Sequence, residues 1–175
     1  EHIQRDRPAV YAFNHTSNIE PPVVYAALRP LYPRLRVLYK AELRKLPILV
    51  WVFDAAGFVP VERANREQTM PALDTAVLAL QGGASFMIFP EGTRSRSGEL
   101  LPFKKGGVVM AIRAGVPVVP AAIVGARDAM GKGSSVVHPV TIDIHFCPPV
   151  ATVGHSLDDR DALTAAVRSA IAAKL

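Results

Sequence analysis

The sequence has a single cysteine, Cys147, so it contains no disulfide framework. Disulfide-dependent proteins belong to oxidising compartments, and this composition therefore favours a cytoplasmic setting. Cys147 lies in a run of strand-forming residues, where we expect a buried thiol. Metal-ligand spacing is also lacking among four of the five histidines, namely His2, His138, His145 and His155, so we expect no metal and no cofactor.

Long hydrophobic runs are absent as well. Half of the residues are hydrophobic and the mean hydropathy is +0.22, yet no apolar run approaches the ~18 residues of a membrane span. The longest apolar passage, residues 46–61, is broken by two prolines, an aspartate and a glycine, so it suits a buried or interfacial segment. Residues 1–7 are polar and charged and carry no signal-peptide pattern.

Aromatic residues make up only 7% of the chain, and its basic residues are scattered, which argues against nucleic-acid binding by base stacking. No recognised nucleic-acid motif appears either, so we expect no nucleic-acid partner. The net charge of +5 and the pI of about 9.7 nevertheless predict an anionic partner, such as lipid headgroups or a phosphorylated metabolite. Ordinary solvated surface charge explains the same composition.

Short β-rich runs alternate with helical patterns along the chain. This alternation predicts an α/β fold: one domain spanning residues 1–175, with a central, largely parallel sheet flanked by helices. We expect a motif-bearing core over about residues 9–147 and a closing helix over about 157–174. The candidate strands are residues 9–13, 36–39, 58–62, 85–89, 117–124 and 140–146. Two irregular stretches, 91–103 and 126–139, are long enough to be functional loops.

Helix signals fall between these strands. A proline pair opens a helix over residues 21–28, a second helix follows Ala41, and a capping box at Ser156 and Asp159 starts the closing helix. Residues 68–81 form a further helix, because apolar residues recur at helical spacing and two glycines follow. The apolar positions of that helix are Met70, Leu73, Val77 and Leu80.

A polar cluster follows the first strand, where open α/β sheets usually place their active sites. It reads Asn-His-Thr-Ser-Asn-Ile-Glu from residue 14 to residue 20. His15 and Glu20 are five positions apart, so they meet only through a turn. Glu20 at a helix N-terminus could orient the imidazole and stabilise its protonated form, as a base that deprotonates an alcohol requires. A structural histidine beside a carboxylate is the alternative.

A second cluster follows the fourth strand, as Pro-Glu-Gly-Thr-Arg-Ser at residues 90–95. Gly92 permits close backbone approach, Thr93 offers a hydroxyl, and Arg94 supplies a planar fork that binds phosphate in bidentate fashion. These residues predict an anion site. An ordinary turn with a surface salt bridge between Glu91 and Arg94 is the alternative.

Together the two clusters resemble the glycerolipid acyltransferase family, which includes glycerol-3-phosphate and 1-acylglycerol-3-phosphate acyltransferases. The family's first motif is a histidine followed after four residues by an aspartate, and His15 to Glu20 matches it with a longer acid. The third motif, Phe-Pro-Glu-Gly-Thr-Arg-Ser, is present unchanged at residues 89–95. Residues 57–63 and 116–120 resemble the second and fourth motifs, so all four occur in order, over about residues 9–147.

The resemblance implies that His15 removes the proton from an acceptor hydroxyl while that hydroxyl attacks a thioester carbonyl, and that Glu20 supports the imidazole. Thr16, Ser17 and Ser95 lack a G-x-S-x-G elbow, so direct transfer is favoured over an acyl-enzyme. The acceptor site implied by the resemblance has two arginines that hold a phosphate, and it comprises Arg63, Glu91, Gly92, Thr93, Arg94 and Ser95. The proline-bearing run at 116–120 either lines an acyl channel or is a buried strand.

We therefore expect an O-acyltransferase of bacterial phospholipid biosynthesis that converts 1-acylglycerol 3-phosphate into phosphatidate. We expect its donor to be acyl-CoA or an acyl carrier protein and its acceptor to be a lysophospholipid. We expect the protein to lie at the cytoplasmic face of the membrane, bound peripherally to anionic lipid. Acylation of another polar lipid and a non-catalytic lipid-binding module are the alternatives. Family members usually carry an N-terminal hydrophobic segment, whereas this chain reaches its first strand by residue 9, so it is either trimmed or a shorter member.

Overall fold

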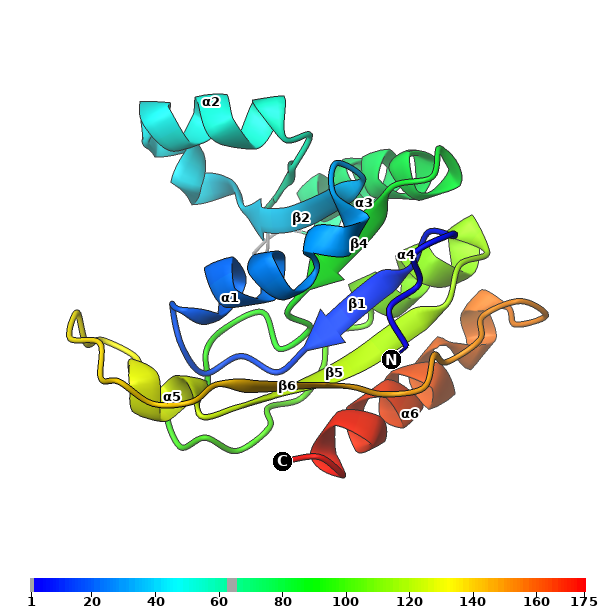
Figure 1. Ribbon diagram of the computed structural model, residues 1–175. Coiled ribbons are helices and arrows are strands. Elements are labelled where there is room, and N and C mark those ends of the chain that lie inside the picture. The colour runs from blue at the N-terminus through cyan, green and yellow to red at the C-terminus, as the bar shows by residue number, and fades with distance from the viewer. Residues whose placement is uncertain (1, 63–65) are drawn as a thin grey trace.

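The computed structural model describes residues 2–62 and 66–175 and shows an α/β fold around one six-stranded sheet (Figure 1). The strands are β1 (Val10–Phe13), β2 (Leu35–Lys40), β3 (Val59–Val61), β4 (Ser85–Ile88), β5 (Val118–Val124) and β6 (Asp143–Phe146). Their order across the sheet is β3-β2-β4-β1-β5-β6. All neighbouring pairs are parallel except β5 and β6, which are antiparallel. The expected α/β fold with a largely parallel sheet is confirmed.

The helices lie between these strands and, at the end of the chain's element order, after β6. They are α1 (Glu20–Ala27), α2 (Pro47–Ala55), α3 (Arg66–Gln81), α4 (Gly106–Ala114), α5 (Ala126–Ala129) and α6 (Arg160–Ala172), with 3₁₀ turns η1 (Arg29–Leu31), η2 (Ala41–Lys45) and η3 (Leu157–Asp159). Among the described residues, no helix is both long enough and apolar enough to cross a membrane.

The strand β1 occupies the middle of the sheet, and its side chains are buried on both faces. Val10 and Ala12 point into the core formed with α3, α4 and α6, whereas Tyr11 and Phe13 point into the core formed with α1. This alternation follows from the pleat of a strand, which directs successive side chains to opposite faces. Burial on both faces explains why the parallel strands read as continuous apolar runs in the sequence.

The helix α4 was not predicted from the sequence. It begins with Gly106 and Gly107, and glycine is a weak helix former, so its start carries no clear signal. The structure explains the second glycine, because a Cβ on Gly107 would lie 2.1 Å from Cδ1 of Ile88. Only a residue without a side chain lets α4 pack this closely on β4.

Other elements differ from the prediction in detail. The helix expected after Ala41 is divided into η2 and α2, and the strand expected from residue 140 begins at Asp143. The stretch 126–139, predicted to be irregular, contains the short helix α5. In α3 the side chains of Leu73, Val77 and Leu80 are buried as expected, but Met70 is 41% exposed. The run 116–120 leads into β5, whose first six residues are buried, as expected for a parallel strand.

Candidate functional site

His15 and Glu20 meet across the turn between β1 and α1. His15 Nδ1 lies 2.6 Å from Glu20 Oε2, although the two residues could not meet on a regular helix. Glu20 is the first residue of α1 and its side chain is fully buried, while the side chain of His15 remains 15% exposed. The longer side chain of glutamate, which the family pattern has as aspartate, therefore still reaches the imidazole.

The second oxygen of Glu20 is held by the turn itself. Glu20 Oε1 accepts hydrogen bonds from the backbone N–H of Thr16 at 2.9 Å, the hydroxyl of Thr16 at 2.7 Å and the backbone N–H of Ser17 at 3.1 Å. These three groups all donate to Oε1, so Glu20 acts toward them only as an acceptor, as a carboxylate does. The proton of neutral His15 then belongs on Nδ1, and Nε2 keeps the lone pair that a general base uses.

The imidazole of His15 is also fixed by an aromatic ring. Phe89, directly after β4, stacks on it with ring centroids 4.2 Å apart and planes inclined by 26°. The contact joins the first motif to the third, because β1 and β4 are neighbours with Ala12 opposite Ile88. One face of the imidazole is thus covered, and its hydrogen bond to Glu20 sets the rotation of the ring.

Glu91 holds the backbone of both loops. One of its oxygens accepts a hydrogen bond from the backbone N–H of His15 at 2.7 Å, and the other from the backbone N–H of Leu101 at 3.0 Å. The side chain is only 5% exposed, and burial raises its pKa above the ordinary value, an effect that these two backbone N–H groups partly offset. The salt bridge to Arg94 considered from the sequence is not what this carboxylate forms.

The backbone of the loop after β4 turns at Gly92, which has a positive φ of 70° that favours glycine. A Cβ at this position would lie 2.9 Å from Cε of Lys104, so the lysine stem packs directly against the turn. The loop is tied to the histidine turn, because the N–H of Ser95 donates to the carbonyl of His15 at 2.8 Å. The third motif therefore contributes to the position of His15.

Arg94 presents an unused donor beside these groups. Its Nη1 atom is buried and has no hydrogen-bond partner among the described residues. Since a buried guanidinium donor without a partner is costly, this atom marks a place for an anionic ligand. Thr93 is exposed, whereas Ser95 is buried and its hydroxyl accepts the N–H of Gly98 at 3.2 Å within the loop. The remaining predicted phosphate ligand, Arg63, lies outside the described residues.

A cavity of about 170 Å³ opens beside the loop after β4. Its walls include Phe89, Pro90 and Gly92 from the third motif, together with Lys104. The rest of the lining is mostly apolar and comes from β2, β3, β4 and the helices α3 and α4, with Leu38, Val61, Thr69, Leu73, Ile88, Gly106 and Gly107. An apolar wall with one cationic side chain suits an amphiphilic molecule that carries negative charge.

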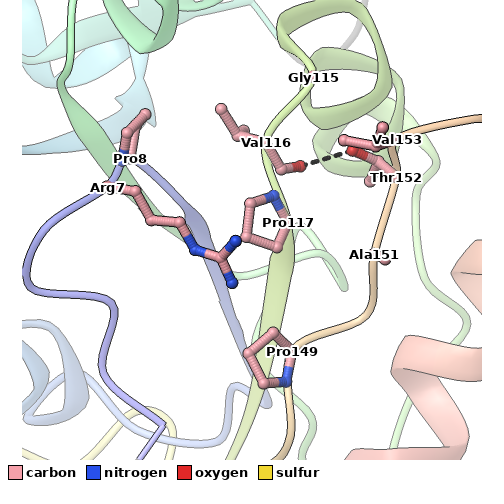
Figure 2. Close-up of a pocket in the computed structure, with 9 residues that line it drawn as sticks. All are labelled: Arg7, Pro8, Gly115, Val116, Pro117, Pro149, Ala151, Thr152 and Val153. Atoms are coloured by element: carbon pink, nitrogen blue, oxygen red, sulfur yellow. Dashed lines mark hydrogen bonds between the residues drawn. The ribbon is translucent and has the colours of Figure 1, made fainter.

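A second cavity, of about 190 Å³, lies at the opposite ends of the strands (Figure 2). It is lined by residues that precede β1 and β5, among them Pro8 and Val116, and by the segment near Thr152, whose hydroxyl donates to the carbonyl of Val116. Arg7 is the single charged side chain in its wall. The cavity is lined by Val116 and Pro117 of the fourth motif but by no residue of the first or third motif, and we assign it no chemistry.

Three supporting residues were not assigned roles from the sequence. The side-chain amide of Asn14 donates to the carbonyl of Ile123 and accepts from its N–H. These two hydrogen bonds join the end of β1 to β5 beyond the last backbone pair. Lys132 Nζ donates to the carbonyl of Arg94 at 2.8 Å. Phe89 was placed at a strand end and in the third motif, but its contact with His15 was not expected. These contacts span many residues in the sequence, so no local pattern indicates them.

Comparisons with known proteins agree with this arrangement. The family model described as Acyltransferase matches residues 1–124. A chloroplastic 1-acyl-sn-glycerol-3-phosphate acyltransferase, BAT2 of Brassica napus, is 36% identical over 129 residues, which are 74% of this chain and 36% of the relative. A 1-acyl-sn-glycerol-3-phosphate acyltransferase of Limnanthes douglasii is 35% identical over 155 residues, or 87% of this chain and 54% of the relative. This chain thus spans about a third to a half of these two relatives.

A solved structure shares the fold. The crystal structure of the 1-acyl-sn-glycerophosphate acyltransferase PlsC from Thermotoga maritima superposes with a TM-score of 0.78 and 31% identity, covering 99% of this chain and 68% of that one. The family match, the sequence relatives and this structure agree with the motifs around His15 and Arg94. The chain belongs to the acyltransferase family, as a PlsC-like glycerolipid acyltransferase.

Proposed function

We propose that this chain transfers a fatty acyl group from a thioester to the free hydroxyl of 1-acylglycerol 3-phosphate and so forms phosphatidate. The observation that carries the proposal is the occurrence of an oriented imidazole, His15, and of Nη1 of Arg94, a buried donor without a partner among the described residues, on loops after neighbouring strands. The first group can activate a hydroxyl, and the second can hold the phosphate of the same molecule.

In the proposed reaction, Nε2 of His15 takes the proton of the acceptor hydroxyl as its oxygen attacks the thioester carbonyl. The resulting imidazolium is stabilised by Glu20, whose Oε2 lies 2.6 Å from Nδ1. The tetrahedral intermediate then collapses, the carbon–sulfur bond breaks, and the leaving thiolate recovers the proton from His15. The cysteine takes no part, since Cys147 is buried and burial raises the pKa of its thiol.

The cavity beside Gly92 supports an amphiphilic substrate. Its apolar wall suits an acyl chain, and Lys104 at the same cavity suits a phosphate or carboxylate group. Acyl-CoA and acyl carrier protein are both proposed as donors, because each presents its acyl group as a thioester.

The test is an assay of the purified protein with acyl-CoA and with acyl carrier protein as donors. Acceptors would be 1-acylglycerol 3-phosphate, glycerol 3-phosphate, a lysophospholipid with a choline headgroup and a monoacylglycerol, which has no phosphate. We expect thiol release coupled to phosphatidate formation with 1-acylglycerol 3-phosphate, and little product with monoacylglycerol. Equal product from both would remove the assigned role of the phosphate site. Binding of the acceptor without any product from either donor would instead indicate a lipid-binding module.

A further inference from the structure

The helix α2 carries apolar side chains on the surface of the molecule. It lies at the edge of the molecule, above β2 in Figure 1. Phe53 holds it in place, with ring centroids 4.5 Å from Tyr39 and 5.6 Å from Phe58. The ion pair of Arg44 with Asp54, at 2.9 Å, joins η2 to the end of α2. These contacts use one side of the helix and leave another side uncovered.

The uncovered side chains are large and apolar. Trp51 is 76% exposed, and Leu46 and Val52 are about half exposed, at 51% and 45%, with Leu43 of η2 at 38%. We call these four residues the α2 face. From the sequence, a core helix was one explanation of this apolar passage, but a tryptophan this exposed does not lie in a core. Aromatic side chains with one polar atom, such as tryptophan, are typical of the boundary between lipid headgroups and acyl chains.

The charges beside the α2 face favour an anionic surface. Lys40, Arg44 and Lys45 lie on or next to η2, and the two carboxylates there, Glu42 and Asp54, are each paired with a cation. Lys45 is exposed, so the segment keeps a positive excess. An anionic lipid surface matches that excess, and its attraction adds to the transfer of the apolar side chains out of water.

The position of the face fits a route for a lipid substrate. The turn η2 follows β2 at the carboxyl end of the strand, which is the end of the sheet where His15 and Arg94 lie. Leu38 of β2 and Val61 of β3 line the cavity beside the site. A bilayer in contact with the α2 face would therefore lie near the opening through which a lipid could enter.

We propose that the α2 face docks the protein on an anionic lipid bilayer, with Trp51 inserted at the headgroup boundary. The docking surface deepens the proposed function, because it would bring the enzyme to its lipid substrate. Only this purpose rests on the proposed function, since binding to lipid can be measured without turnover. An apolar helix face can also bind a second copy of this chain, and the experiment below distinguishes bilayer binding from dimer formation.

The test uses vesicles of equal parts phosphatidylcholine and phosphatidylglycerol, and vesicles of phosphatidylcholine alone. Because Trp51 is the only tryptophan, its emission reports directly on this face. We expect a blue shift with the anionic vesicles, and co-flotation that weakens but persists as salt is raised, because the apolar part is not screened. Trp51→Ala should lower the partition coefficient by about tenfold or more, as expected for the loss of a large apolar side chain.

The matched control is Leu78→Ala on α3, since Leu78 is 70% exposed but lies outside the α2 face. We expect this variant to bind vesicles like the wild type. Equal partition of the wild type and Trp51→Ala, or wild-type emission that does not change while the protein floats, would overturn the proposal. A concentration-dependent dimer that Trp51→Ala abolishes, without vesicle binding, would assign the face to a second copy.

Turnover separates this proposal from the proposed function. With a short-chain, dissolved 1-acylglycerol 3-phosphate, Trp51→Ala should keep its turnover within about twofold, whereas activity on vesicle-embedded acceptor should fall with the partition coefficient. A protein that binds vesicles through Trp51 but shows no turnover would refute the enzyme and leave the docking face. An active protein whose vesicle binding is unchanged by Trp51→Ala would refute the docking face and leave the enzyme.

Discussion

The two loops that form the site differ in how completely their polar atoms are used. In the turn after β1, both oxygens of Glu20 and Nδ1 of His15 are hydrogen-bonded within the chain. In the loop after β4, Nη1 of Arg94 is buried without a partner among the described residues. The first loop is complete before substrate arrives, as expected of groups that must be preorganised for catalysis. The second keeps a buried donor that suits an anionic ligand.

The largest expected effect is at His15 in the complete loop. His15→Ala should lower kcat by about 10²- to 10⁴-fold, because a positioned general base supplies a factor of that size. The side chain is partly exposed and its main bonding partner is a single carboxylate, so the thermal unfolding midpoint should change little. Steady-state kinetics and circular dichroism melting measure the two quantities. A well-folded variant with substantial activity would show that another group is the base.

Substitutions of Glu20 test whether the turn after β1 requires the negative charge of this side chain or its length. Glu20→Gln should lower kcat on the order of 10²-fold, because an amide that donates toward Nδ1 favours the wrong tautomer of His15. Glu20→Asp keeps the charge but is shorter, so a measurable fraction of activity should remain. The pH dependence of kcat for both variants gives the comparison. Equal losses would mean that the 2.6 Å contact matters as much as the charge.

Arg94 tests the incomplete loop. Arg94→Ala should raise the KM for a phosphate-bearing acceptor about tenfold to a hundredfold, as expected for a lost charge-assisted contact, with the donor KM within about twofold. Arg94→Lys should restore only part of the affinity, since an ammonium group does not reproduce the guanidinium fork. Product formation at varied acceptor and donor concentrations measures both constants. If the two constants rise together, Arg94 supports the fold or the donor instead.

Glu91 joins the loops, and its effect is the smallest and depends on pH. Burial raises its pKa above the ordinary value of 4.5, so folding favours the protonated carboxyl. The stability that this preference contributes is fully present below pH 4.5 and is lost as the pH rises through the higher folded pKa. Glu91→Gln removes the titration. The free energy of unfolding of wild type minus variant should therefore fall as the pH rises above 4.5, as urea denaturation would measure. A difference that rises with pH over this range would contradict the assignment.

Much of the fold follows from local patterns in the sequence. The strands β1, β4 and β5 are buried on both faces and read as apolar runs, and all six strands were expected close to their observed positions. The helix α3 followed from its repeat of Leu73, Val77 and Leu80. In contrast, α4 begins with two glycines, and the reason for Gly107 is a contact with Ile88 that exists only in the folded chain.

The residue types of the site were predictable from the sequence, but the contacts that each side chain makes were not. His15 and Glu20 were expected to meet through a turn, and they do. Glu91 was expected to shape the acceptor pocket, whereas its carboxylate bonds the backbone N–H groups of His15 and Leu101. Lys132 is 38 residues from Arg94 in sequence, and local patterns carry no information about such a contact.

The central place of β1 has a consequence for how the active site forms during synthesis. The strand that leads to His15 is made before its two neighbours in the sheet, β4 and β5, which begin 75 and 108 residues later, at Ser85 and Val118. Contacts this distant in sequence form slowly, because the closure of a long loop must precede them. A nascent chain that stops before Val118 therefore exposes an apolar strand edge beside His15, a form that invites aggregation or chaperone binding. His15 is translated long before β5, yet it reaches its final position only when that strand has joined the sheet.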